Sequence, residues 1–129
     1  MAGIDDVRRI VEPLPRAYEV LVGDRIKFRV GRIVFAALSA DESLLGFGFP
    51  REERAALVAS DPDKFLMPLK SDERYQWVRL RLAAVETDEL AELLTDAWRM
   101  CVPKKVAAEY LDQAARGENQ VDPDARIQQ

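Results

Sequence analysis

Residues 26–38 read IKFRVGRIVFAAL, two apolar stretches joined at Gly31. In the first stretch, apolar side chains alternate with Lys27 and Arg29, which predicts a strand with one face in the core and the other in water. Residues 33–38 are apolar on both faces, and this pattern is typical of a central strand. A glycine between the two stretches favours a tight turn. The segment is therefore expected to form two neighbouring antiparallel strands.

Strand patterns continue on both sides of this segment. Residues 18–49 are rich in β-branched and aromatic side chains and are interrupted at Gly23, at Gly31 and at 39–43, which predicts a meander of short antiparallel strands. Residues 76–82 alternate again, so they are expected to form a further strand. On this strand one face carries Val78, Leu80 and Leu82, and the other carries Trp77, Arg79 and Arg81.

Two amphipathic segments before residue 61 predict helices. In the first, Asp5 is expected to cap a helix that ends at Pro13, because Asp favours the N-cap and proline stops a helix. The second is expected to open at Pro50, with Glu52 and Glu53 in its first turn, where carboxylates suit the helix dipole.

The C-terminal third predicts two more helices. Thr87 is expected to cap a long helix, and Pro103 marks its end or a kink. Residues 104–115 predict a last, weaker helix. The long helix has an apolar stripe formed by Leu90, Leu93, Leu94, Ala97, Trp98 and Cys101.

The order of these elements indicates an α+β fold. Helix, strand meander, helix, strand and helix predict two layers, with helices packed on one face of a largely antiparallel sheet. Residues 1–111 are expected to form a single domain. Residues 112–129 are polar and short of large apolar groups, which predicts a frayed helix end followed by a disordered tail.

The composition restricts the kinds of catalytic and metal sites that this chain can form. A chain of 129 residues suits one domain. It holds one cysteine, Cys101, and no histidine. A lone thiol cannot close an internal disulfide, which favours a reducing compartment, and the lack of imidazole excludes Ser-His-Asp and Cys-His catalysis and the zinc sites that need histidine. We therefore expect no enzymatic activity, no metal and no cofactor.

Net charge and hydropathy predict where the protein resides in the cell and which partners it lacks. The net charge of -4 argues against indiscriminate binding to nucleic acid or anionic lipid through the overall field. The N-terminus lacks the basic and apolar regions of a secretory signal, and no apolar run approaches the roughly 18 to 20 residues of a membrane helix. We expect a cytoplasmic protein with no membrane partner.

Short motifs follow one another along almost the whole predicted domain. They are DVRRI at 6–10, LP at 14–15, FRV at 28–30, FA at 35–36, REERAAL at 51–57, WVRLRL at 77–82, ELAELL at 89–94, AWR at 97–99 and PKK at 103–105. Each motif alone is a common amphipathic pattern. In this order and spacing they resemble the MmcQ/YjbR-like family, over residues 5–111.

The resemblance implies a small α+β fold with helices on one side of an antiparallel sheet, and DNA binding by a double-wing motif whose wings are β-hairpins. It implies no reaction. Family members often carry a histidine just before the tryptophan that matches Trp77, where this chain has Tyr75 and Gln76. The glycine of the first hairpin, Gly31, also lies one position early, which changes the expected shape of that wing.

The outward-facing residues of the two alternating strands form the candidate site. Guanidinium and ammonium groups bind phosphates, and an exposed aromatic ring can stack on a base. The same residues also fit an ordinary solvated face, with the tryptophan lying on the aliphatic stems of its neighbours, and both interpretations stay open. The candidate nucleic-acid-binding residues are Lys27, Arg29, Arg32, Trp77, Arg79 and Arg81, extended by Arg25.

Two functional hypotheses follow, with different partners. The first is weak, non-specific DNA binding through the basic sheet face. The second is a protein-interaction or chaperone-like adaptor that binds an unidentified protein and no nucleic acid, because an open sheet face and a free sheet edge offer a surface to a protein.

Overall fold

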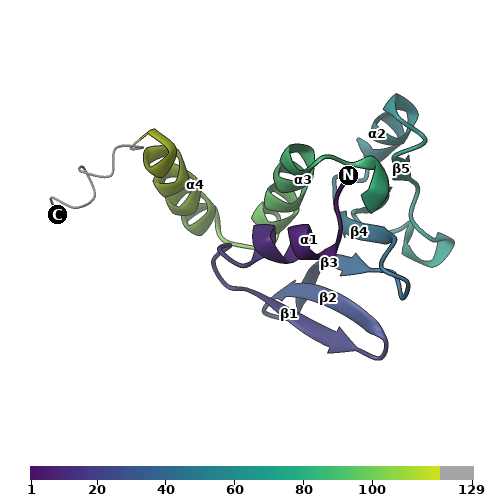
Figure 1. Ribbon diagram of the computed structural model, residues 1–129, viewed down its shortest axis with the longest axis horizontal. Helices are drawn as coiled ribbons and strands as arrows, with labels where there is room; N and C mark the ends of the chain where they lie inside the picture. The colour runs from purple at the N-terminus through teal and green to yellow at the C-terminus, as the bar shows by residue number, and fades with distance from the viewer. Residues whose placement is uncertain (120–129) are drawn as a thin grey trace, which may run out of the picture.

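The computed structural model describes residues 1–119, which form an α+β fold with helices on one face of a six-stranded sheet (Figure 1). The elements, in chain order, are α1 (Ile4–Val11), β1 (Ala17–Val22), β2 (Arg25–Val30), β3 (Ile33–Leu38), β4 (Leu44–Gly48), α2 (Arg54–Ser60), β5 (Phe65–Leu66), β6 (Trp77–Arg81), α3 (Thr87–Arg99) and α4 (Lys104–Asn119). Two short 3-10 turns, Lys70–Asp72 and Leu82–Ala84, flank β6. The predicted fold class is confirmed.

The sheet has the strand order β1-β2-β3-β4-β6-β5, and every neighbouring pair is antiparallel. Strands β1 to β4 form the predicted meander. Its first two turns begin at Gly23 and Gly31, whose φ angles of +65° and +59° lie in the left-handed region that glycine tolerates best. The two-residue strand β5 had no counterpart in the sequence prediction.

A β-bulge in β3 interrupts its regular pairing with β2. Phe28 faces Ala36 while Arg29 faces Val34, so β3 carries one extra residue, Phe35. Phe35 and Ala36 are consecutive and both buried. This local departure from alternation helps to explain why the sequence of β3 is apolar throughout.

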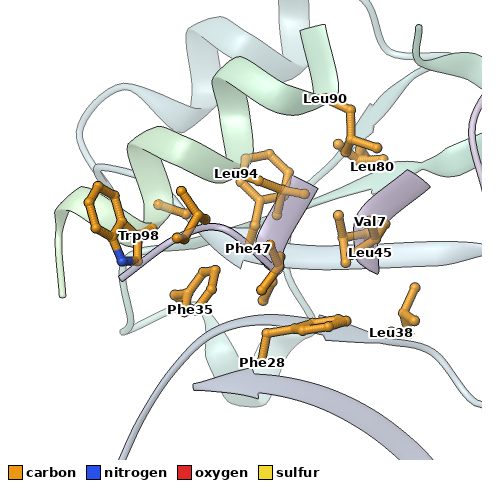
Figure 2. Packing of buried hydrophobic residues seen from close by; sticks show 14 of the residues in the cluster. Val7, Phe28, Phe35, Leu38, Leu45, Phe47, Leu80, Leu90, Leu94 and Trp98 are labelled. Atoms are coloured by element: carbon orange, nitrogen blue, oxygen red, sulfur yellow. The ribbon is translucent and has the colours of Figure 1, made fainter. Parts of the chain in front are cut away.

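The core lies between the sheet and the helices α1 and α3. Figure 2 shows buried side chains of the strands on the side of the sheet that faces α3: Phe47 lies near Leu94, Phe35 lies near Trp98, and Phe28 lies beneath both phenylalanines. The Trp98 indole Nε1 donates a hydrogen bond to the carbonyl oxygen of Pro15 at 2.8 Å. The expected apolar stripe is confirmed on α3, where Leu90, Leu94, Ala97 and Trp98 are buried and Leu93 is half-buried. Cys101 was wrongly assigned to this stripe, because α3 ends at Arg99 and Cys101 lies in the turn that follows, half-buried against the core.

The predicted starts of α1 and α3 were wrong by one or two residues. The N-cap of α1 is Gly3, not Asp5, and the Asp6 carboxylate accepts a hydrogen bond from the Gly3 N–H. The carboxylate that reaches back is thus the one at the third helical position, as in a capping box. In α3 the N-cap is Glu86, whose carbonyl accepts from the Leu90 N–H, and Thr87 is already helical.

The second helix starts later than predicted. Residues before Arg54 form a turn in which the Glu53 N–H bonds to the Pro50 carbonyl, so Glu52 and Glu53 precede the helix. The physical reason is that the Phe49 N–H is still bonded to the Gln76 carbonyl. The helix can therefore begin only after the chain has left the sheet.

The last helix, α4, leads away from the sheet (Figure 1) and continues to Asn119, beyond the predicted end at 115. The Tyr110 ring packs edge-on against Trp98, with a centroid separation of 5.4 Å. The rest of the predicted tail, residues 120–129, lies outside the described residues. No helix in the described part is long and apolar enough to cross a membrane.

Candidate functional site

The face of the sheet turned away from α1 and α3, here called the open face, carries the predicted basic side chains. Lys27 and Arg29 alternate with buried Phe28 on β2, and Arg79 and Arg81 alternate with buried Leu80 on β6. Alternation therefore directs these cations away from the core. Arg32 lies in the turn after β2 and is exposed.

One row of residues crosses the middle of the open face. The pairings place Lys27, Ala37, Gly46 and Arg79 side by side on β2, β3, β4 and β6. Three strand spacings put the Lys27 and Arg79 backbones roughly 14 Å apart. The small residues between them leave a depression with a cation on either side.

This depression is a groove of about 570 Å³, here called the sheet groove. Its floor includes Val34, Ala37, Leu44 and Gly46; one wall is formed by Arg25 and Lys27 of β2; the other consists of Trp77 and Arg79 of β6 with Leu69, Asp72, Tyr75 and Gln76 from the preceding loop. The volume falls in the range of small-molecule sites. The groove thus joins an apolar floor to charged and aromatic walls.

The groove depends on the absence of a side chain at Gly46. A Cβ atom there would lie 2.5 Å from Nε1 and 2.8 Å from Cε2 of the Trp77 indole. Only glycine lets the half-buried indole lie over β4 in this position. The sequence pattern identified Trp77 as a candidate but gave no role to Gly46.

A buried arginine, which sequence reasoning missed, holds the aromatic wall. Arg54 at the start of α2 is 7% exposed. Its Nη1 donates to the carbonyls of Tyr75 at 2.9 Å and Trp77 at 3.3 Å, and its Nη2 donates to that of Glu73 at 2.5 Å. The available signal was its spacing, because Arg54 lies three residues before Leu57 and four before Val58, on the inward face of the helix.

The two arginines of β6 are partly engaged. The Nε atom of Arg79 donates to the Met67 carbonyl at 3.0 Å, and that of Arg81 donates to the Asp63 carbonyl at 3.1 Å. These bonds tie the chain around β5 to the sheet edge. Both side chains face outward as predicted, but only Arg81 is exposed, whereas Arg79 is half-buried.

Lys27 and Arg29 are also half-buried rather than exposed. Their cross-strand neighbours are Ala37 and Val34, and long aliphatic stems cover such small apolar surfaces. The Nε atom of Arg29 is buried without a hydrogen-bond partner. The expected faces are thus correct, but the exposure of these side chains was overestimated.

The positive charge of the open face is not neutralised by ion pairs. In the described part of the chain, the side-chain cations in ion pairs are Arg8, Arg9, Lys64, Arg99 and Arg116. None of these belongs to the candidate site. The carboxylate that lines the groove, on half-buried Asp72, takes part in none of these ion pairs.

The structure brings some of the candidate residues together and separates others. Lys27, Trp77 and Arg79 line the groove together with Arg25, while Arg29, Arg32 and Arg81 lie outside it. Cys101 is not among the residues that line the groove, and burial raises the pKa of its thiol. This thiol is therefore a poor nucleophile at neutral pH.

Comparisons with known proteins agree with this architecture. A family model described as YjbR matches residues 13–100. Uncharacterized proteins of Mycobacterium bovis and Mycobacterium tuberculosis are 33% identical to this chain over 129 residues, covering 86% of it and 97% of their own length. The crystal structure of Deinococcus radiodurans protein DR2400, assigned to the domain family DUF419, matches with a TM-score of 0.70 at 21% identity, over 85% of this chain and 88% of that one. The last likeness is one of fold.

Proposed function

The chain belongs to the YjbR family, as its motifs predicted, and we propose that it binds nucleic acid through the open face of its sheet. One observation carries the proposal: Arg25, Lys27 and Arg79 surround a groove beside a half-buried tryptophan, and no carboxylate pairs with them in the described part of the chain. Unpaired cations beside an aromatic ring are the groups that bind phosphates and stack on bases.

The arrangement favours a pre-formed site. The Trp77 indole lies over Gly46, where a side chain would displace it. Arg54 donates one hydrogen bond to the Trp77 carbonyl and two more to the carbonyls of Tyr75 and Glu73 in the preceding loop. A ring that is already positioned loses little conformational freedom on binding. The aliphatic stems of Lys27 and Arg29 are similarly held, since both side chains are half-buried.

The role proposed is binding without catalysis. The chain has no histidine, and the lone thiol has a raised pKa. Contacts made mainly with phosphates carry no direct sequence information. We therefore propose weak affinity and little discrimination through the cationic contacts alone.

The test measures binding of labelled duplex and single-stranded DNA by fluorescence anisotropy at 50 and 200 mM salt. If about four phosphates are contacted, affinity for the duplex falls roughly a hundredfold across this range. The variant Arg25→Glu with Lys27→Glu removes two cations that make no hydrogen bond or ion pair in the described part of the chain, and we expect it to lose binding.

A matched control keeps the total charge change the same. Lys104→Glu with Lys105→Glu alters two exposed residues at the start of α4, where carboxylates suit the helix dipole. We expect this variant to bind like the wild type. Equal loss in both variants, or no saturable binding by the wild type at 50 mM salt, would refute the proposal.

A second candidate, a protein-binding adaptor, is favoured by the outer edge of β1. This strand ends the sheet, and its Leu21 and Val22 are 67% and 40% exposed. An unpaired edge with apolar side chains suits the addition of a strand from a partner. Light scattering of the wild type and of a Leu21→Lys variant tests whether a second copy pairs there. We expect the wild type to form a dimer and the variant to be monomeric. A monomeric wild type would show that a second copy does not use this edge.

A further inference from the structure

We infer that the sheet groove binds one unpaired guanine nucleotide, with the base against the wall of β6 and its preceding loop and the phosphate on β2. The inference rests on the proposed function and adds a ligand class to it. It follows from how the charged and polar groups are divided between the two walls of the groove.

The wall on the β2 side is cationic. Arg25 and Lys27 contribute its charged groups, and neither belongs to an ion pair in the part of the chain that the structure describes. Arginine and lysine are the side chains that bind phosphate most readily. The phosphate of a bound nucleotide therefore belongs at this wall.

The opposite wall combines two aromatic rings with a carboxylate, an amide and one cation, Arg79, whose Nε is already bonded to the Met67 carbonyl. Trp77 and Tyr75 offer surfaces on which a base can stack. Asp72 is half-buried and lines the same wall. An ionised carboxylate only accepts hydrogen bonds, and it can accept two neighbouring ones at once. It therefore selects a base with two adjacent donors.

The amide of Gln76 has a defined orientation. Its Oε1 accepts a hydrogen bond from the Arg51 backbone N–H at 3.2 Å. An N–H group can bond only to the oxygen of the amide, so the NH2 group of Gln76 stays available as a donor. The wall thus presents acceptors at Asp72 and a donor at Gln76.

Guanine matches this pattern. Its Watson–Crick edge has two adjacent donors, the N1–H and the 2-amino group, followed by the O6 acceptor. Uracil and thymine have one donor between two acceptors, and adenine and cytosine have one donor group beside a ring acceptor. In a duplex this edge is occupied by the pairing partner, so the groove requires an unpaired base.

The experiment follows the Trp77 indole N–H signal by NMR in the full chain, assigned with a Trp77→Phe variant. The chain is titrated with 5′-GMP, 5′-IMP, which lacks only the 2-amino group, and 5′-UMP. Loss of one hydrogen bond to a charged acceptor weakens binding by about tenfold or more. We expect GMP to bind at least that much more tightly than IMP, and UMP to bind more weakly still.

Two matched variants assign the preference to a residue. Asp72→Asn keeps the shape of the side chain but loses an acceptor, and it should bind GMP and IMP with equal affinity. Glu73→Gln changes the neighbouring exposed side chain, whose residue contacts Arg54 only through its backbone carbonyl, and it should keep the wild-type preference. Equal affinities for GMP and IMP in the wild type, or a preference that survives Asp72→Asn, would overturn the inference.

A short oligothymidylate separates this inference from the proposed function, because it contains no guanine. If it binds with salt-sensitive affinity while GMP and IMP bind equally, the guanine site is wrong and nucleic-acid binding stands. If it does not bind while GMP is preferred as expected, the groove is a mononucleotide site and the broader proposal is wrong.

Discussion

The indole of Trp77 on β6 lies directly over the backbone of Gly46 on the adjoining strand β4. Its Nε1 is 2.5 Å from the point where a Cβ atom at position 46 would be. Gly46→Ala must therefore displace the indole or shift β4. We expect the free energy of unfolding to fall by about 1–3 kcal/mol, as for other overpacked sites, and tryptophan fluorescence to report a more exposed ring. Gly48→Ala is the control, because its nearest neighbour would be Ala97 Cβ at 3.6 Å, an ordinary contact. Equal effects of the two substitutions would contradict this account.

Removal of the Arg54 guanidinium should release the aromatic wall of the groove. Arg54→Ala leaves three carbonyls without their donor, and we expect a loss of about 2–3 kcal/mol in chemical denaturation. Arg51→Ala removes an exposed arginine that donates to the Arg74 carbonyl at 2.6 Å, and it should cost less than about 1 kcal/mol. Comparable losses would show that burial of Arg54 is not what matters.

Trp77→Ala should distinguish the two forms of DNA. Stacking on an aromatic side chain contributes about 1–3 kcal/mol for each unpaired base, whereas bases in a duplex are already stacked. We expect the affinity for single-stranded DNA to fall by roughly tenfold and that for duplex DNA to change little, measured by anisotropy at low salt. Tyr110→Ala, which alters an aromatic ring on α4 packed against Trp98, should change neither affinity in a folded protein.

Leu94 is fully buried at the centre of the core, so Leu94→Ala should cost about 2–5 kcal/mol through lost burial and a residual cavity. Leu93 is only half-buried on the same helix. Leu93→Ala should therefore cost clearly less in the same urea titration. The reverse order would mean that the packing of α3 on the sheet differs from the one described.

The Asp41 carboxylate, in the turn between β3 and β4, should stay ionised to an unusually low pH. The Ser43 hydroxyl and backbone N–H, and then the Ser39 hydroxyl, donate to the Asp41 carboxylate and lower its pKa to about 2. Because the folded pKa lies below the unfolded value, this contribution to stability is fully present above about pH 4. It is lost as the pH falls toward 2. An NMR titration that places the pKa of Asp41 near the ordinary 3.8 would disprove the arrangement.

The strands could be predicted because alternation in residues 26–30 and 77–81 reports directly which face is buried. Helix starts were less accurate, since they depend on contacts across the fold. The start of α2, for example, is delayed by the bond between Phe49 and Gln76, which are far apart in the sequence.

The candidate site was predicted only in part, for a similar reason. The cations of β2 and β6 could be placed on one face, but the sequence does not say that β6 lies beside β4. Without that pairing, neither the groove floor at Gly46 nor the loop with Asp72 and Tyr75 could be joined to Trp77. Arg54 was missed because a buried arginine bound only to carbonyls leaves no partner charge in the sequence.

Arg54 donates hydrogen bonds only to main-chain carbonyl oxygens, so its role in holding the loop does not depend on the side chains of the loop residues. Residues 73 and 75 contribute only their carbonyls to that anchor. Substitution of their side chains leaves these hydrogen bonds of Arg54 in place, and one of the two residues, Tyr75, belongs to the groove wall. The chain thus separates the part that keeps the loop in place from a part that meets the ligand, so ligand preference can diverge while the fold stays intact.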